Sequence, residues 1–111
     1  MPINRPSWFP RSDALHRKIV AQSTQGYAPY TDYDARQLAL ALAGEAGEVA
    51  QVFYKRVRDN MTDAEFRPHL RKELADVRIY LELLEECVGG DTDKDVEAKL
   101  TEVEARWKDK P

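Results

Sequence analysis

Two pairs of acidic residues are the best candidates for chemistry in this chain. Glu45 and Glu48 form the first pair, and Glu73 and Asp76 form the second. Residues three apart on a helix are surface neighbours, so each pair sets two carboxylates side by side. Hard divalent cations such as Mg²⁺ prefer oxygen ligands of this kind. The spacing therefore predicts a metal site if the two helices meet.

Both pairs fall within the apolar stripe of their segments. Each helical residue turns about 100° around the axis, which places apolar residues on the face of each pair. The face of Glu45 carries Leu38, Leu42, Val49 and Val52, and the face of Glu73 carries Leu70, Val77, Tyr80 and Leu84. The opposite side of the second segment, where surface charges are expected, carries Arg71, Arg78 and Glu82. We therefore expect all four acids at the contact between two antiparallel helices.

Four carboxylates in such a contact need compensation, because taking a charge out of water costs several kcal/mol and like charges repel. A divalent cation would compensate all four together. Two alternatives stay open: a solvated face, or ion pairs with a base such as Arg36 or Lys18. A ferritin-like di-iron site fits less well. It needs Glu-x-x-His, and neither His16 nor His69 has a glutamate three residues earlier.

Helical periodicity dominates the rest of the chain and predicts an all-α fold. We expect helices over about 13–25, 34–58, 68–88 and 93–108, with Pro68 in a first turn and a stop at Gly89-Gly90. Thr62 and Glu65 could instead form a capping box for an earlier short turn, which leaves the start of the third helix open. Three prolines within 1–11 predict a non-helical arm. The expected architecture is a single domain, 1–111, arranged as an antiparallel four-helix bundle that is completed by oligomerisation.

Composition excludes several classes of protein. The 111 residues include 20 acids and 17 bases, a formal net charge of -3, which argues against a nucleic-acid binder. One cysteine, Cys87, cannot form an internal disulfide framework or a thiolate zinc site. No apolar run reaches the roughly 20 residues of a membrane helix, and the N-terminus lacks a signal-peptide pattern. We expect a cytoplasmic protein without a membrane partner.

Gly44 and Gly47 bracket the first acidic pair. A glycine inside a helix costs about 1 kcal/mol relative to alanine, so these two require an explanation. Close packing against another helix is one, and room for a ligand beside Glu45 and Glu48 is the other.

The segments LALAGEAGEVA and KELADVRIYL together resemble the MazG-like all-α nucleoside triphosphate pyrophosphohydrolases, whose signature is Glu-x-x-Glu on one helix and Glu-x-x-Asp on the next. The resemblance covers about 38–107. It implies hydrolysis of a (d)NTP to a (d)NMP and pyrophosphate, with Mg²⁺, or Mn²⁺ in its place, on the four acids. It also implies a homodimer or homotetramer. We assign the orientation or deprotonation of the attacking water to Glu48.

Four further residues are candidate substrate contacts. Lys55 and Lys99 match lysines of the family and could bind phosphate, although Lys55 could simply favour the helix C-terminus. Trp8 and His16 belong to an N-terminal aromatic group, with Phe9, Tyr27 and Tyr30, that could stack on a base or serve as core or interface. Thr101 and Glu104 replace the asparagine and serine of many relatives. That departure motivates an alternative function, a non-catalytic helical module for nucleotide binding or dimerisation.

Overall fold

The described part of the chain, residues 5–23 and 32–111 of a computed structural model, is all-helical. It contains four helices and no strand: α1 (Phe9–Ser23), α2 (Asp32–Arg58), α3 (Asp63–Cys87) and α4 (Thr92–Trp107). The predicted all-α class is confirmed. Within this part, no helix combines the length and the apolar character needed to cross a membrane.

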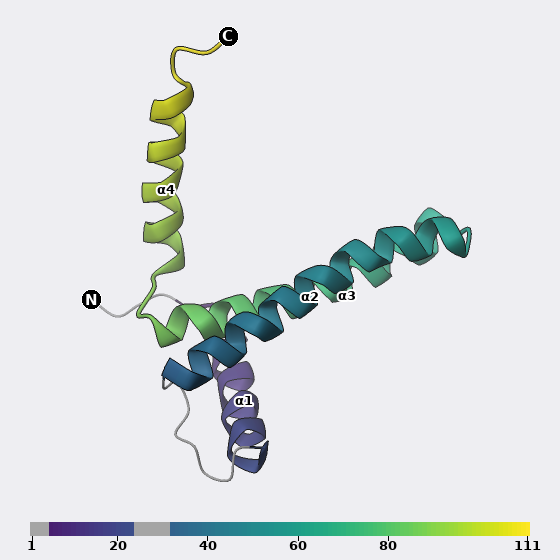
Figure 1. The fold of residues 1–111 in the computed structure, drawn as a ribbon, viewed down its shortest axis with the longest axis horizontal. Helices are drawn as coiled ribbons and strands as arrows, with labels where there is room; N and C mark the ends of the chain where they lie inside the picture. The colour runs from purple at the N-terminus through teal and green to yellow at the C-terminus, as the bar shows by residue number, and fades with distance from the viewer. Residues whose placement is uncertain (1–4, 24–31) are drawn as a thin grey trace.

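The long helices α2 and α3 form an antiparallel hairpin that is the body of the molecule (Figure 1). Helix α2 contains no proline, and alanine and leucine, which favour helix formation, dominate its first half. Three basic residues in its last turn interact favourably with the negative end of the helix dipole. Asn60 adopts a positive φ of 51° in the turn that reverses the chain. Buried apolar side chains along the hairpin are Leu38, Val52, Phe66 and Leu83.

The start of α3 differs from the prediction. Thr62 caps the helix by accepting a hydrogen bond from the Glu65 backbone N–H at 3.2 Å, and α3 begins at Asp63. The Thr62/Glu65 cap therefore opens the whole third helix, five residues before Pro68. Pro68 lies in the second turn and not in the first, so its missing N–H removes one hydrogen bond of the helix. A favourable cap with acids in the first turn offsets that loss.

The N-terminal arm is shorter than predicted, because α1 begins at Phe9 and not near residue 13. Pro10 occupies the first turn, where the missing N–H has no helical partner in any case. Ser12 does not cap the helix; its hydroxyl donates to the Phe9 carbonyl at 3.0 Å. Phe9 is buried against Leu38 and Leu83, which fixes α1 to the hairpin at the end where α2 begins.

Helix α4 points away from the rest of the molecule (Figure 1). Gly89, with a φ of +68°, ends α3, and Asp91 caps α4 by accepting from the Lys94 backbone N–H at 3.3 Å. These helix ends agree with the prediction. Helix α4 has no buried residue, and its apolar side chains Val96, Leu100, Val103 and Trp107 are exposed. Packing of four helices into a bundle would thus need contacts beyond those present in this single chain.

The open shape leaves a large surface. The accessible area is 8514 Å², about 2,200 Å² more than the roughly 6,300 Å² expected for a compact monomer of this mass. The radius of gyration is 17.4 Å, compared with about 13 Å for a compact domain of this length. Helix α4, which stands clear of the hairpin, contributes to this excess.

Candidate metal centre

The α2–α3 hairpin brings the two acidic pairs together near its middle. Glu45 on α2 meets Glu73 and Asp76 on α3, and one carboxylate oxygen from each lies within 4.8 Å of the other two. Antiparallel packing of the two apolar stripes is the cause, since each pair lies in its stripe. The expected juxtaposition of the two helices is therefore present for these three acids.

Two oxygens of this group lack any compensating partner. Glu45 Oε2 and Glu73 Oε2 are both buried, and neither has a hydrogen-bond partner. Within the described residues, no Lys or Arg forms an ion pair with any of the four acids. The alternative partners Arg36 and Lys18 have exposed side chains. Buried carboxylate oxygens without a partner are costly and rare, so this group of acids needs a cation or a proton.

Both glutamates hold their protons more strongly than a free side chain would. Burial is the main cause that raises the pKa of Glu45, followed by the charges of Glu48 and Asp76. Burial also raises the pKa of Glu73, with Glu48 as the next contributor. A site that concentrates negative charge in this way attracts protons and metal cations alike.

Glu48, the predicted catalytic acid, occupies the solvent side of the group. Its side chain is exposed, and it interacts with the carboxyl groups of both Glu45 and Glu73. Because it is next to the buried acids and open to water, it can reach a molecule that approaches from outside.

The glycines beside the acids do not serve close packing within this chain. A methyl group added at Gly44 or at Gly47 would meet no atom within 4 Å, and both residues are exposed. The packing explanation is therefore wrong for the single chain. Open space beside Glu45 and Glu48 agrees with the second explanation, room for a ligand.

The predicted substrate contacts are scattered. Lys55 is half-buried on α2, about 10 Å along the helix from Glu48. Lys99 lies on α4, pairs with Glu102 at 3.2 Å, and is not brought to the acids within one chain. Trp8 packs against the core cluster, and Phe9 belongs to that cluster, as the core interpretation expected. His16 is half-buried on α1, while Tyr27 and Tyr30 lie outside the described residues.

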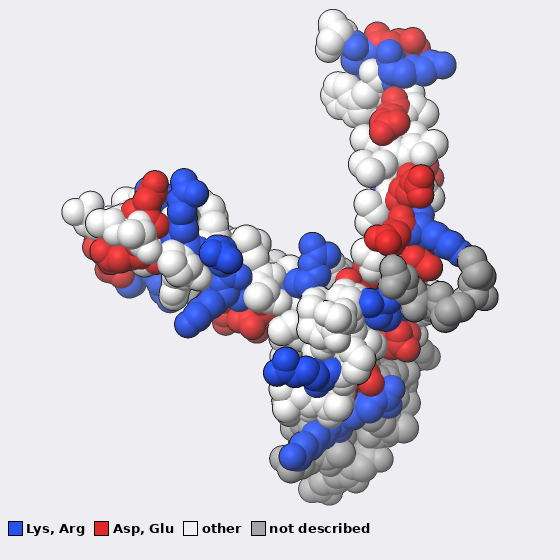
Figure 2. Space-filling view, turned by 180° about the vertical axis from the view of Figure 1, so that it is seen from behind, with Lys and Arg blue, Asp and Glu red and all other residues white. Residues whose placement is uncertain are grey.

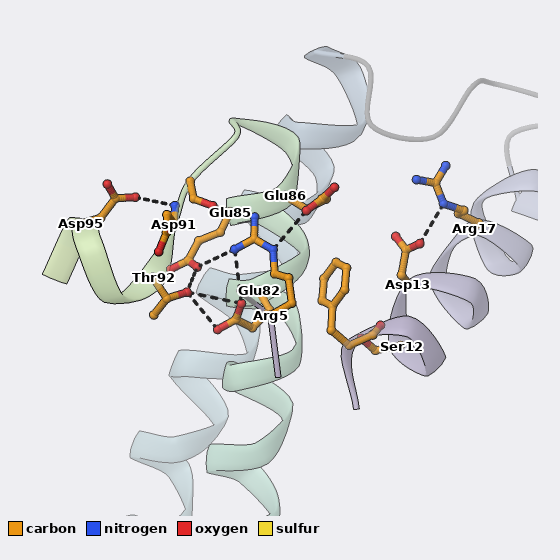
Figure 3. A network of polar contacts seen from close by, with 12 residues as sticks. Arg5, Ser12, Asp13, Arg17, Glu82, Glu85, Glu86, Asp91, Thr92 and Asp95 are labelled. Atoms are coloured by element: carbon orange, nitrogen blue, oxygen red, sulfur yellow. Dashed lines mark hydrogen bonds and ion pairs between the residues drawn. The ribbon is translucent and has the colours of Figure 1, made fainter. Parts of the chain in front are cut away.

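The sequence analysis missed a second charged cluster, at the corner between α3 and α4 (Figure 3). Glu82, expected on the surface, is only 1% exposed. Arg5 reaches it from the N-terminal segment, with Nη1 at 3.9 Å from Glu82 and 3.7 Å from Glu85, and Nε at 3.1 Å from Glu86. Arg5 Nη2 also donates to the Gly90 carbonyl at 2.6 Å. The Thr92 hydroxyl bonds both Glu82, at 3.3 Å, and Glu85.

The sequence does contain a signal for this corner, a group of three glutamates, but helical periodicity alone does not indicate that they are buried. Three glutamates at 82, 85 and 86 occupy adjacent turns, and such a group needs a cation. The cation is Arg5, about 80 residues earlier, and only the tertiary fold places it there. Burial and the charge of Glu85 raise the pKa of Glu82, while Thr92 and Arg5 oppose that rise.

These pKa shifts predict an unusual pH dependence of stability. In metal-free buffer the free energy of unfolding should fall as the pH rises from about 4.5, because the native state keeps protons on Glu45, Glu73 and Glu82 that the unfolded chain has released. Mg²⁺ should raise the melting temperature more at about pH 7.5 than at about pH 5, where protons compete with it. Circular-dichroism melts with EDTA or Mg²⁺, at matched ionic strength, measure both effects. A metal-free stability that climbs with pH over this interval would contradict the assignment.

The fold and site define a class in outline: an all-α chain with an acidic cluster between two antiparallel helices. Comparison with protein-family models, with curated proteins and with solved structures found no match to the chain. The function of this chain therefore has to be inferred from its residues and their geometry.

Proposed function

We propose that this chain is a Mg²⁺-dependent nucleoside triphosphate pyrophosphohydrolase, which hydrolyses a (d)NTP to the (d)NMP and pyrophosphate. One observation carries the proposal: two buried carboxylate oxygens without partners, from different helices, belong to one cluster of acids. A structural acid pair would be compensated by a base, and a surface pair by water. A cluster that has buried oxygens and no base is suited to a cation, and Mg²⁺ suits a set made only of oxygen ligands. The resemblance of these segments to MazG-like enzymes supports the same activity.

In this proposal Glu45, Glu73 and Asp76 hold the ion, with Glu48 beside them. When bound, Mg²⁺ neutralises charge on the triphosphate and helps to align it with the attacking water. Glu48 orients that water and accepts its proton on a carboxylate oxygen, since its side chain is exposed beside the two buried glutamate oxygens. Lys55 offers a positive charge farther along α2 for a phosphate.

The remaining substrate contacts require a second chain. Lys99 lies on α4, away from the acids of its own chain, so it can approach such a cluster only in a partner subunit. We extend the proposal to a homodimer or homotetramer in which Lys99, and the Trp8 and His16 region, border a neighbouring site. Housecleaning of the cytoplasmic nucleotide pool would suit this activity.

One observation favours a second candidate, the non-catalytic helical module. The Thr101 hydroxyl donates a hydrogen bond within its own helix, to the Glu97 carbonyl at 3.1 Å, and Glu104 is exposed on the same helix. Neither residue reproduces the asparagine or serine of many MazG-like relatives. Binding of nucleotide without turnover would support this second function.

A panel of canonical and modified (d)NTPs with Mg²⁺ tests the proposal. We expect equal amounts of monophosphate and pyrophosphate from at least one substrate, and no product in EDTA. Chromatography of the nucleotides separates this reaction from release of a single phosphate. Absence of turnover across the panel, with Mg²⁺ or Mn²⁺, would refute the enzyme and leave the non-catalytic module.

A further inference from the structure

The outer face of α3 is an apolar surface that the described helices leave partly open. Beside α1 it forms a groove of about 740 Å³, lined by apolar side chains that include Trp8, Leu15, Ala75 and Ile79. A neighbouring pocket of about 450 Å³ continues along α3 past Leu74, Val77 and Leu81. The two share Ala75 and Arg78, so they form one continuous surface, called here the α1/α3 groove.

Helix α4 has the complementary shape. Val96, Leu100, Val103 and Trp107 fall within about 60° around its axis and form a narrow apolar stripe. All four are at least 36% exposed, and Trp107 is 65% exposed. An isolated helix of 16 residues is marginal in water, so an uncovered stripe on a helix of this length indicates a missing packing partner.

The charges of the two surfaces are complementary. Among the described side chains that line the α1/α3 groove, the charged ones are basic: Arg11, Arg71 and Arg78. Helix α4 carries five acids and three bases, and Asp93, Glu97 and Glu104 flank one side of its stripe. Seen from behind, acidic side chains run along α4 with Lys and Arg near its two ends, and Lys and Arg lie among fewer acids over α1 and the adjoining part of the hairpin (Figure 2).

The corner between α3 and α4 keeps the stripe away from the groove of the same chain. Arg5 holds the Gly90 carbonyl at 2.6 Å, and Thr92 is bonded to Glu82 and Glu85. These contacts fix the direction in which α4 leaves α3 (Figure 3). These contacts do not prevent the α4 stripe of one chain from reaching the groove of a second copy.

From these observations we infer that α4 of one chain docks in the α1/α3 groove of a second copy, and that the exchange is reciprocal. The interface is made of Leu100 and its stripe on one side and Leu74 with its apolar neighbours on the other, with groove arginines facing the acids of α4. The inference rests on other residues than the metal site, so its failure would leave the assignment of the metal ligands untouched.

Sedimentation equilibrium of single variants tests the two surfaces. The unmodified chain should be a dimer at micromolar concentration, and Leu100→Asp or Leu74→Asp should each weaken dimerisation at least about 10-fold. Both side chains are about half exposed, so the helical circular-dichroism signal should persist. Leu40→Asp is the matched control, because Leu40 is exposed on α2 outside the groove and should leave the dimer intact. A monomeric unmodified chain, or dissociation by Leu40→Asp alone, would overturn the inference.

Cross-linking decides whether the groove is filled by a second copy or by the chain's own α4. In a Cys87→Ser background, Leu74→Cys and Leu100→Cys are introduced into separate chains, which are mixed and treated with a short bis-maleimide. Covalent dimers should form in the mixture and also when both cysteines are on one chain. An internally cross-linked monomer from the double variant would show own-chain closure and refute the exchange.

Discussion

Glu45→Gln is expected to stabilise the metal-free protein and at the same time to abolish turnover of (d)NTP. The amide keeps the size of the side chain and removes one charge from a cluster in which burial, Glu48 and Asp76 all raise the pKa of Glu45. The melting temperature in EDTA at neutral pH should therefore rise. Loss of a metal ligand should lower kcat/KM at least about 100-fold, which corresponds to about 2.7 kcal/mol.

The opposite signs of the two effects make this variant informative. Substitution of an acid with a structural role would lower both the melting temperature and the activity. Substitution of a metal ligand in this cluster should raise the metal-free melting temperature and lower the activity. The melting-temperature increase with Mg²⁺ should also shrink or vanish in Glu45→Gln. Asp109→Asn, at an exposed acid near the C-terminus, should change none of the three readouts. Full activity of Glu45→Gln would exclude Glu45 from the site.

Arg5→Ala is expected to be the most destabilising single substitution at the α3–α4 corner. It removes the cation that faces Glu82, Glu85 and Glu86 and leaves the buried Glu82 carboxylate without a positive partner. Breaking a buried ion pair in this way costs 3–5 kcal/mol in general. We expect about 3 kcal/mol, the lower end, because the closest pair involves the partly exposed Glu86. The melting temperature should fall by about 10 °C.

Two comparisons separate this effect from a general loss of side-chain packing. Arg17→Ala removes an exposed arginine that pairs with Asp13 at 3.1 Å on α1, and should cost under about 1 kcal/mol. Glu82→Gln should recover part of the stability of Arg5→Ala, because the buried charge disappears with its partner. Urea unfolding of the single and double variants measures the coupling. Strict additivity of the two substitutions would contradict the ion-pair explanation.

The position of the acids could be predicted because it depends on local periodicity. A turn of about 100° per residue puts Glu45 and Glu73 in the same stripes as Leu38 and Leu84, and these stripes must face each other in a short-linked hairpin. Placing the acids in these stripes requires no information about residues that are far away in the sequence. The helix ends set by Gly89 and Asp91 follow from local backbone chemistry in the same way.

Errors arose where two local signals competed. Prolines at 10 and 68 suggested boundaries, yet Pro10 lies inside the first turn of α1 and Pro68 inside the second turn of α3. Proline limits where a helix can begin, while the cap and the first-turn acids decide where it does begin. At α3 the Thr62 cap prevailed, and the third helix gained five residues over the expected start.

The burial of Glu82 and the direction of α4 belong to the tertiary structure alone. Periodicity places Glu82 on the outer side of α3, and in the folded chain it is contacted by Arg5, from the far end of the sequence, and by Thr92. The same contact, through Gly90, directs α4 away from the hairpin. Sequence by itself thus determined which residues share a helix face, because that depends on the backbone repeat. Which faces are covered depends on contacts between distant segments, and only the folded chain decided it.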